Sequence, residues 1–329
     1  MASREASHAG SWYTSNKNEL SSQLDHWLDK VPNTAIPIGT ESSKEGPVSI
    51  PSTGARAIIA PHAGYSYSGP AAAWAYKSLD WSNAKRIFLL GPSHHHYLAG
   101  CALTQCSVYE TPLGDLQIDE ATVKELHSKG KFDKMSLSVD EAEHSLEMHI
   151  PYIHKMLSLN FKDPSHFPPL ITILVGNTSP STERQYGALL SPYLSDPTTI
   201  FIISSDFCHW GSRFRYTYYR PSSGPAQQLR TSSSSPKSPK IYESIAAVDH
   251  ESMDVVETGS HEEFLQQLEE TGNTVCGRHP IGVFMAAVEA NEGLERGKGR
   301  FKFVRYERSG DVESVRDSSV SYCSAFAVF

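Results

Sequence analysis

Residues 55–65 read ARAIIAPHAGY, in which a six-residue, almost continuously apolar stretch passes directly into a proline, a histidine and a glycine. Such a short and almost continuously apolar run is typical of a strand that is buried on both faces of a parallel sheet. The turn residues that follow it end the strand and leave His62 at its carboxyl end. This stretch therefore predicts a buried strand with a ligand-type side chain directly after it.

The same pattern recurs along the chain. Three further apolar runs occur at residues 85–90 (KRIFLL), 170–175 (LITILV) and 199–204 (TIFIIS). Helical patterns are found at residues 70–79, 119–128, 145–157, 181–194, 242–257, 261–270 and 280–290. Two late segments, 300–308 and 319–328, are expected to be strands that close an edge of the sheet. The alternation predicts an α/β fold with a mainly parallel central sheet flanked by helices.

Two segments interrupt this alternation, at residues 36–54 (IPIGTESSKEGPVSIPSTG) and 221–240 (PSSGPAQQLRTSSSSPKSPK). Both are rich in Ser, Pro, Gly and Thr, and they carry too few apolar side chains to offset the entropy cost of ordering. We expect both to be mobile surface insertions. The second could instead link two domains, but a loop extension of about 20 residues is also ordinary. We therefore expect residues 1–329 to form a single domain.

The composition is that of a globular protein, with 39% hydrophobic and 20% charged residues. The 29 Lys and Arg residues against 37 Asp and Glu residues give a net charge of -8. This charge repels a nucleic-acid backbone, and no basic run compensates for it. We expect no nucleic-acid partner.

The apolar runs are all far shorter than the stretch of about 20 residues that a helix needs to span a bilayer. Residues 1–12 lack the basic segment and the apolar stretch of roughly 7–15 residues that form a secretory signal. The five cysteines are too few, and odd in number, for a disulfide framework. We expect no membrane span, reduced thiols and a cytoplasmic location, with the nucleus left open as a second location.

Ligand-type residues follow three of the four predicted strands. His62 follows the first strand, His94 follows the second, and Asp206 and His209 follow the fourth. Ligands of open parallel sheets bind beyond the carboxyl ends of the strands, so these turns are expected to converge there. Each histidine taken alone could merely hydrogen-bond its own turn. The coincidence of three strand ends favours a shared pocket.

Imidazoles on different strands suit divalent metals, because one ring nitrogen coordinates while a neighbouring group holds the other. A carboxylate from Asp206 would complete the two-histidine, one-carboxylate set of ferrous oxygenases. Cys276 is a second option for the third ligand, since it precedes a proline-initiated helix beside Arg278 and His279. A thiol in this position is expected to have a depressed pKa and to be available as thiolate. The alternative is that Cys276 is a small buried apolar residue.

Residues 143–149 (EHSLEMH) are predicted to open a helix with Ser145 as its N-cap. His144 and Glu147 would then lie on neighbouring faces, a spacing that suits a metal pair or an acid–base dyad. The order of residues is not the HExxH of zinc proteases. We retain His144 as a candidate catalytic residue, with local capping and surface ion pairing as the alternative.

Residues 210–220 (WGSRFRYTYYR) interleave three arginines with aromatic rings in an otherwise acidic chain. Arginine binds carboxylate or phosphate bidentately, and aromatic side chains stack on flat groups. The pattern favours a binding rim for anions and aromatic groups, with a solvated surface segment as the alternative. The GxSxG, P-loop and GxGxxG motifs are absent, which disfavours serine hydrolases, nucleoside triphosphatases and dinucleotide-binding proteins.

Six segments together resemble the eukaryotic Memo (mediator of cell motility) family. They are REASHAGSWY (4–13), APHAGY (60–65), GPSHH (91–95), EHSLEMH (143–149), SSDFCHW (204–210) and CGRHP (276–280). The resemblance covers nearly the whole chain apart from the two Ser- and Pro-rich insertions. It implies a single α/β domain similar to the class III extradiol dioxygenases of the LigB type.

The resemblance also implies a pocket lined by the residues that match His62, His94, Asp206, His209 and Cys276. Members of this family are associated with iron or copper binding and with redox chemistry. We take the two strand-end histidines and the cysteine as the metal ligands. The carboxylate and His209 are expected to orient a ligand or to transfer a proton.

Binding of phosphotyrosine peptides, receptor signalling, the cytoskeleton and cell motility or invasive growth are further implied by the resemblance. Trp12, Arg213 and Arg215 match its recognition surface, and we add Tyr65 and Arg278 as expected ligand-binding residues. A phosphotyrosine-containing or other anionic peptide, and cytoskeletal or signalling proteins, are therefore the expected partners.

Three functions follow in order of preference. A metal-binding redox protein comes first, because a cysteine ligand makes a softer site that suits Cu(I) better than dioxygen activation at Fe(II). A phosphotyrosine-peptide-binding adaptor without catalysis comes second, and an extradiol-type ring-cleaving dioxygenase comes third. A metal-dependent oxidoreductase activity is left open.

Overall fold

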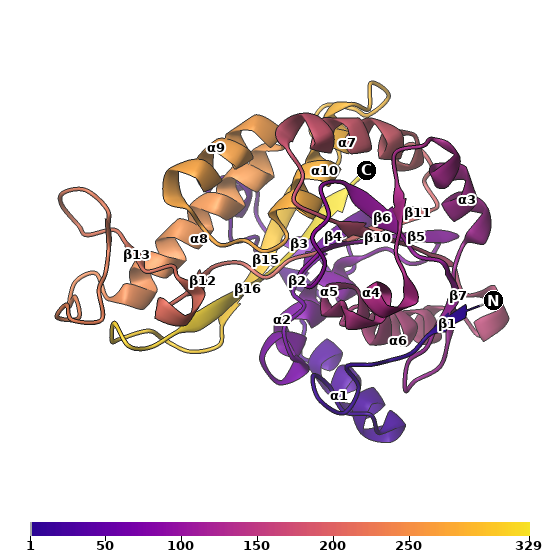
Figure 1. Cartoon of the computed structure of the whole chain (residues 1–329), viewed down its shortest axis with the longest axis horizontal. Coiled ribbons are helices and arrows are strands. Elements are labelled where there is room, and N and C mark those ends of the chain that lie inside the picture. The colour runs from indigo at the N-terminus through magenta and orange to yellow at the C-terminus, as the bar shows by residue number, and fades with distance from the viewer. Residues whose placement is uncertain (1) are drawn as a thin grey trace.

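Four parallel strands form the centre of the main sheet in the computed structural model, which describes residues 2–329 (Figure 1). In spatial order they are β4 (Ala55–Ala60), β11 (Thr199–Ser204), β5 (Arg86–Pro92) and β10 (Leu170–Val175). Ile202 of β11 lies between Ile58 and Leu89 of its two neighbours. Nearly all side chains of these strands are buried, as the apolar runs predicted.

Antiparallel strands extend the sheet on both sides. On one side, β16 (Ser319–Val328) pairs with β4, and both β15 (Phe301–Arg308) and β12 (His209–Trp210) pair with β16. On the other side, β6 (Cys101–Leu103) pairs with β10, and β9 (Asp133–Lys134) runs parallel to β6. The prediction that two late strands close one edge is confirmed. The parallel core and the flanking helices also confirm the predicted α/β architecture.

Helices cover both faces of the sheet (Figure 1). One side carries α2 (Tyr65–Ser78), which packs on β4, β15 and β16, with α1 (Lys17–Asp29) and α6 (Ile150–Asn160) against it. The other side carries α10 (Arg278–Glu289), which packs on β5, β11 and α7 (Pro180–Leu194). The remaining long helices are α3 (Glu120–Ser128), α8 (Ile241–Thr258) and α9 (His261–Thr271).

The short elements lie around this core. They are β1 (Ala2–Arg4) with β7 (Cys106–Tyr109) and β8 (Leu116–Gln117); β2 (Thr34–Ala35) with β3 (Val48–Ser49); β13 (Tyr218–Tyr219) with β14 (Gln227–Gln228); α4 (Leu137–Ala142) and α5 (His144–Glu147); and the 3₁₀ turns Ser42–Glu45, Pro164–His166 and Ser212–Phe214.

The single helix expected at residues 145–157 is instead two helices, α5 and α6, which are separated at Met148 and His149. Ser145 is not the N-cap, because Glu143 holds that position and its carboxylate accepts the backbone N–H of Ser145. Helix α1 was not predicted, although Leu20, Leu24 and Leu28 form a buried stripe at helical spacing.

The first insertion contacts the body of the protein. The backbone N–H of Thr40 donates to Asp254, and the hydroxyl of Ser42 donates to Glu257, both on α8. The second insertion is largely exposed, and its strand β14 pairs with β13. The mobility expected of both segments stays a prediction.

All five cysteines carry free thiols, which agrees with the prediction. Among residues 2–329, none of the helices combines the length and the apolar character that crossing a membrane requires.

Candidate metal centre

Three segments that are far apart in the sequence bring His62, His94 and Cys276 together. One ligand atom from each, two ring nitrogens and the sulfur, lie within 4.8 Å of one another. His62 follows β4, His94 follows β5, and Cys276 lies just before α10. The three side chains therefore meet beyond the carboxyl ends of the central strands, where open parallel sheets bind ligands.

The ring of His62 is fixed in one orientation. Its Nδ1 lies 2.6 Å from the hydroxyl of Ser204, and that hydroxyl donates its own hydrogen to the carbonyl of Ser145 at 2.7 Å. Ser204 must therefore accept a hydrogen from Nδ1, which leaves the lone pair on Nε2 directed at the sulfur of Cys276, 3.2 Å away. Burial, and then the neighbouring charge of His94, lowers the pKa of His62 well below its usual value. The ring is thus neutral and able to act as a ligand.

Glu143 fixes the second histidine in the same way. The carboxylate lies 2.8 Å from Nδ1 of His94 and also accepts the backbone N–H of His94 at 2.7 Å. A carboxylate only accepts, so Nδ1 carries the hydrogen and Nε2 is left for ligation. Burial raises the pKa of Glu143, but the hydrogen bond and the charge of His94 outweigh it and lower the pKa to about 2. Sequence analysis missed both this role and that of Ser204, because each depends on a tertiary contact.

The pKa of the Cys276 thiol is shifted in the opposite direction from the one expected. Burial, and then the negative charge of Asp206, raises its pKa well above the usual value, so the predicted depressed pKa was wrong. Helix α10 begins only at Arg278, and the sulfur lies against the backbone of Asp206, whose N–H donates to it at 3.1 Å. The effect of burial in low-dielectric surroundings on this pKa is therefore larger than the opposite effects of the helix end and the nearby basic residues.

Asp206 and His209 do not form the expected carboxylate–imidazole pair. The carboxylate of Asp206 accepts the backbone N–H of His62 at 2.8 Å, whereas Nδ1 of His209 lies 2.8 Å from the carbonyl of Phe207. Within residues 2–329 no hydrogen bond joins the two side chains, and Asp206 is in neither cluster of close ligand atoms. Burial raises the pKa of Asp206 against the charge of His209. Asp206 thus holds the backbone that carries His62.

His144 pairs with different residues from those expected. Its ring stacks between the rings of Trp12 and His94, with centroid distances of 4.3 Å to each. It also shares a cluster of close ligand atoms with His94 and Glu143. Burial, and then the charge of His94, lowers the pKa of His144 to about 3. The expected dyad with Glu147 is not formed.

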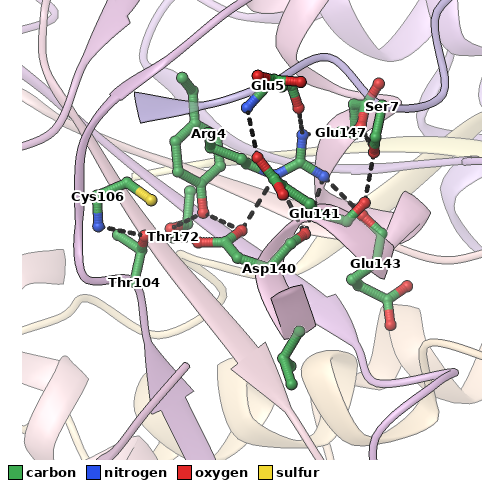
Figure 2. Close-up of polar contacts among 12 residues, drawn as sticks. Arg4, Glu5, Ser7, Thr104, Cys106, Asp140, Glu141, Glu143, Glu147 and Thr172 are labelled. Atoms are coloured by element: carbon green, nitrogen blue, oxygen red, sulfur yellow. Dashed lines mark hydrogen bonds and ion pairs between the residues drawn. The ribbon is translucent and has the colours of Figure 1, made fainter. Parts of the chain in front are cut away.

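Glu147 belongs to a buried ionic cluster with Arg4 and Asp140 (Figure 2). Arg4, which is 1% exposed, pairs with Asp140 at 3.1 Å and with Glu147 at 2.8 Å. Glu147 also accepts the hydroxyl hydrogen of Tyr13 at 2.8 Å. This cluster anchors the segment that carries Trp12, whose side chain is 36% exposed at the pocket.

Trp12 also lines a cavity of about 470 Å³, together with Tyr13, Trp27 and Tyr65. Tyr65 is buried, and its hydroxyl donates to the carbonyl of Met148 at 2.7 Å. Tyr65 therefore offers this cavity an aromatic surface, because its hydroxyl is already paired.

The arginine-rich segment divides into an exposed part and a buried part. Arg213 and Arg215 are exposed, and the guanidinium of Arg213 lies 4.4 Å above the ring of Phe214. Phe214 in turn contacts the ring of His209, with a centroid distance of 5.2 Å. The third arginine, Arg220, is instead paired with an acid of α8.

Two further side chains refine this surface. Trp210 and Tyr216 are buried in a small apolar cluster, so they do not take part in the expected aromatic rim. Arg278 lies beside Cys276, and its buried Nε has no hydrogen-bond partner among the described residues.

Comparisons with known proteins match the chain over almost its whole length. A family model described as Memo-like protein matches residues 4–326. The protein MEMO1 of Homo sapiens is 44% identical over 322 residues, which cover 98% of this chain and 96% of that protein. MEMO1 of Danio rerio is 45% identical over 98% of this chain and 97% of that protein. The protein memo-1 homolog of Caenorhabditis elegans is 41% identical over 98% of this chain and 81% of that protein.

A solved structure, that of the uncharacterized protein JW3007 from Escherichia coli K12, covers 81% of this chain and 99% of that chain. The sequence identity is 13% and the TM-score is 0.43.

Proposed function

The chain belongs to the Memo family, and on that premise we propose that it binds a redox-active metal ion, iron or copper, through His62, His94 and Cys276. The observation that supports this proposal most directly is the set of three donor atoms within 4.8 Å of one another. Two of these atoms are ring nitrogens whose lone pairs are turned toward the pocket by Ser204 and Glu143.

The donor set fits such an ion in both geometry and chemistry. Ligand atoms that lie about 2.0–2.3 Å from a common ion are separated from one another by roughly 3–4 Å. His62 Nε2 and Cys276 Sγ are 3.2 Å apart, which agrees with that spacing. Imidazole nitrogen suits copper and iron, and thiolate favours Cu(I). A bound cation would also favour the thiolate form of Cys276, which burial alone disfavours.

Once bound, the ion would supply one-electron redox chemistry, and the protein residues would set its surroundings. His62 and His94 each present one ring nitrogen while Ser204 and Glu143 hold the other, and Asp206 fixes the backbone at His62. We assign proton transfer to His144, whose ring stacks on that of His94 at 4.3 Å, and to His209, which follows the carboxyl end of β11. His144 suits this role because its Nδ1 is buried without a hydrogen-bond partner in the described chain.

Metal titration of the purified protein tests the proposal. The wild type should bind one equivalent of Cu(I) or Fe(II), and His62→Ala and Cys276→Ser should each weaken binding by at least about tenfold. Cys106→Ser is the matched control, since Cys106 is also buried but lies on β7, outside the pocket. Equal affinity of the Cys276→Ser variant and the wild type would contradict the assignment of the sulfur as a ligand.

A phosphotyrosine-peptide adaptor is the second candidate function. Arg213, Arg215 and Arg278 form no ion pair within residues 2–329, and Trp12 is an exposed aromatic side chain that stacks on His144. Guanidinium groups could hold a phosphate while an aromatic ring stacks on the peptide. Calorimetric titration of a phosphotyrosine peptide and its unphosphorylated twin tests this function. Equal affinity for the two peptides would exclude it.

Links to receptor signalling, the cytoskeleton and cell motility, and a cytoplasmic or nuclear location, are proposed from family membership. Extradiol ring cleavage remains the third candidate, because the sulfur ligand disfavours dioxygen activation at iron. Turnover of a catechol by the iron-loaded protein would move it ahead of the other two.

A further inference from the structure

A second cavity, of about 450 Å³, lies at the opposite end of the sheet from the metal centre. Strand β16 runs antiparallel to β4, so Val328 pairs with Ala55 at the start of β4. His62 follows the other end of the same strand. At about 3.3 Å per residue, β4 separates the two places by roughly 20 Å. The cavity is therefore distinct from the pocket of the proposed metal ligands.

The walls of this cavity combine three kinds of side chain. It is lined by the cations Lys298, Arg300 and Lys302, the hydroxyl residues Ser49, Ser52 and Thr53, and the apolar residues Val48, Phe326 and Val328. None of the described residues that line it is acidic. We refer to it as the cationic cavity.

Two of its cations have no charged partner. Lys302 pairs with Glu45, but Lys298 and Arg300 form no ion pair or side-chain hydrogen bond within residues 2–329. Unpaired cations that share a concave wall produce a local positive potential, even in a chain with a net charge of -8. The cationic cavity therefore attracts an anion.

The loop before β15 holds these two cations in place. Gly297 and Gly299 have φ angles of 90° and 74°, so cationic residues alternate with glycines in the left-handed region. The backbone N–H of Gly299 donates to the carbonyl of Val328 at 2.9 Å, which ties the loop to the sheet. The positions of Lys298 and Arg300 beside the apolar floor are thus set by the backbone.

A neighbouring cavity of about 800 Å³ shares these cations but carries acids on its other wall. Its acids already accept hydrogen bonds: Asp254 from Thr40, and Glu257 from Ser42 and from the backbone N–H of Phe303. An anion in that cavity would face these carboxylates. The acid-free cationic cavity is therefore the better anion site of the two.

We propose that the cationic cavity binds a nucleoside monophosphate. Each part of such a ligand matches one kind of lining: the phosphate matches the unpaired cations, the sugar hydroxyls match the serine and threonine side chains, and the flat base matches the apolar floor. Arg300 can bind phosphate oxygens bidentately, and Lys298 adds a point charge. A volume of about 450 Å³ falls within the range of small-molecule sites, roughly 300–1,000 Å³.

Calorimetric titration of the full-length protein tests this proposal, with adenosine monophosphate, adenosine and inorganic phosphate as the probes. Adenosine monophosphate should bind the wild type more tightly than inorganic phosphate does, and adenosine should not bind. The double variant Lys298→Ala/Arg300→Ala should weaken binding of adenosine monophosphate by at least about tenfold. The double variant Lys124→Ala/Arg184→Ala removes the same charges from exposed positions of α3 and α7, and it should bind like the wild type.

Three outcomes would overturn the proposal. The first is no binding of adenosine monophosphate by the wild type at about 1 mM, the weak end of specific affinities. The second is equal weakening in the two double variants, which would indicate non-specific attraction to net charge. The third is inorganic phosphate binding as tightly as adenosine monophosphate, which would leave no role for the hydroxyl and apolar linings. Metal affinity should be unchanged in both double variants. A negative result for the nucleotide site can therefore be distinguished from a negative result for the proposed metal site.

Discussion

Nε2 of His62 lies 3.2 Å from the sulfur of Cys276, although the two residues are 214 positions apart in the chain. The contact depends on a close approach of the segment before α10 to the end of β11. A Cβ atom on Gly277 would lie 2.4 Å from the backbone oxygen of Ser204 and 2.3 Å from the Cβ of Ser205. The absence of a side chain at Gly277 is therefore what lets the cysteine reach the histidine.

Gly277→Ala should accordingly separate the two ligands. The added methyl group meets backbone, so the α10 segment must move, at a cost of about 1–3 kcal/mol in the free energy of unfolding. Metal affinity should fall as well. Urea unfolding and metal titration check both effects, with Gly310→Ala as the control, because a Cβ at Gly310 meets no atom within 4 Å. Matching behaviour of the two variants would refute the steric argument.

Glu143→Gln should weaken metal binding by roughly 10–100-fold, the usual effect of losing a group that orients a metal-bound histidine. The carboxylate accepts three N–H groups, two from His94 and one from Ser145, whereas an amide has only one oxygen. Metal titration measures the loss, and Glu269→Gln, on the exposed face of α9, controls for the change in charge. If both variants bound metal like the wild type, Glu143 would have no part in orienting His94.

Arg4→Ala should destabilise the protein by about 3–5 kcal/mol, because it leaves two buried carboxylates without their cation. Asp140 and Glu147 are each about 1% exposed, so water cannot replace the guanidinium. Chemical unfolding measures the change. The control Arg184→Ala, at an exposed position of α7, should change the free energy of unfolding by less than about 0.5 kcal/mol.

The stability of the protein should fall in acid because of Glu147. Burial raises the pKa of this carboxyl, but the hydrogen bond from His8 and the charge of Arg4 outweigh it and lower the pKa from 4.5 to about 2. A depressed folded-state pKa gives stability that is complete above the unfolded pKa and is lost as pH falls through the folded one. The loss should amount to about 3 kcal/mol between about pH 5 and pH 2.

The contribution of Glu147 can be isolated by measuring the free energy of unfolding of the Glu147→Gln variant and of the wild type as a function of pH. The variant should be less stable than the wild type at neutral pH, and the difference should shrink as the pH falls. A constant difference from pH 7 to pH 3 would assign the acid sensitivity to other carboxyls.

The sheet could be predicted from sequence because its four central strands are continuous apolar runs bounded by turn residues. The positions of His62 and His94 followed from the same pattern, since both come directly after a strand. The partners of these side chains could not be predicted in this way. Ser204 and Glu143 orient the rings through tertiary contacts that leave no local signal.

Two expectations failed for a related reason. The high pKa of Cys276 results from burial, which a motif of neighbouring basic residues does not reveal. His144 and Glu147 lie in the same short helix, α5, but they do not pair: the ring of His144 stacks on Trp12 and His94, and Arg4 pairs with the glutamate.

The position of β4 between β11 and β16 has a consequence for synthesis of the chain. Strand β16 is made about 260 residues after β4, which at roughly 5–20 residues per second is a delay of roughly 13–50 s. During that time the ARAIIA strand has an unpaired edge, and apolar edges of this kind pair readily with other chains. The nascent protein is thus most vulnerable to aggregation along β4, and a chaperone that shields this segment until residue 328 is made should raise the yield of folded protein.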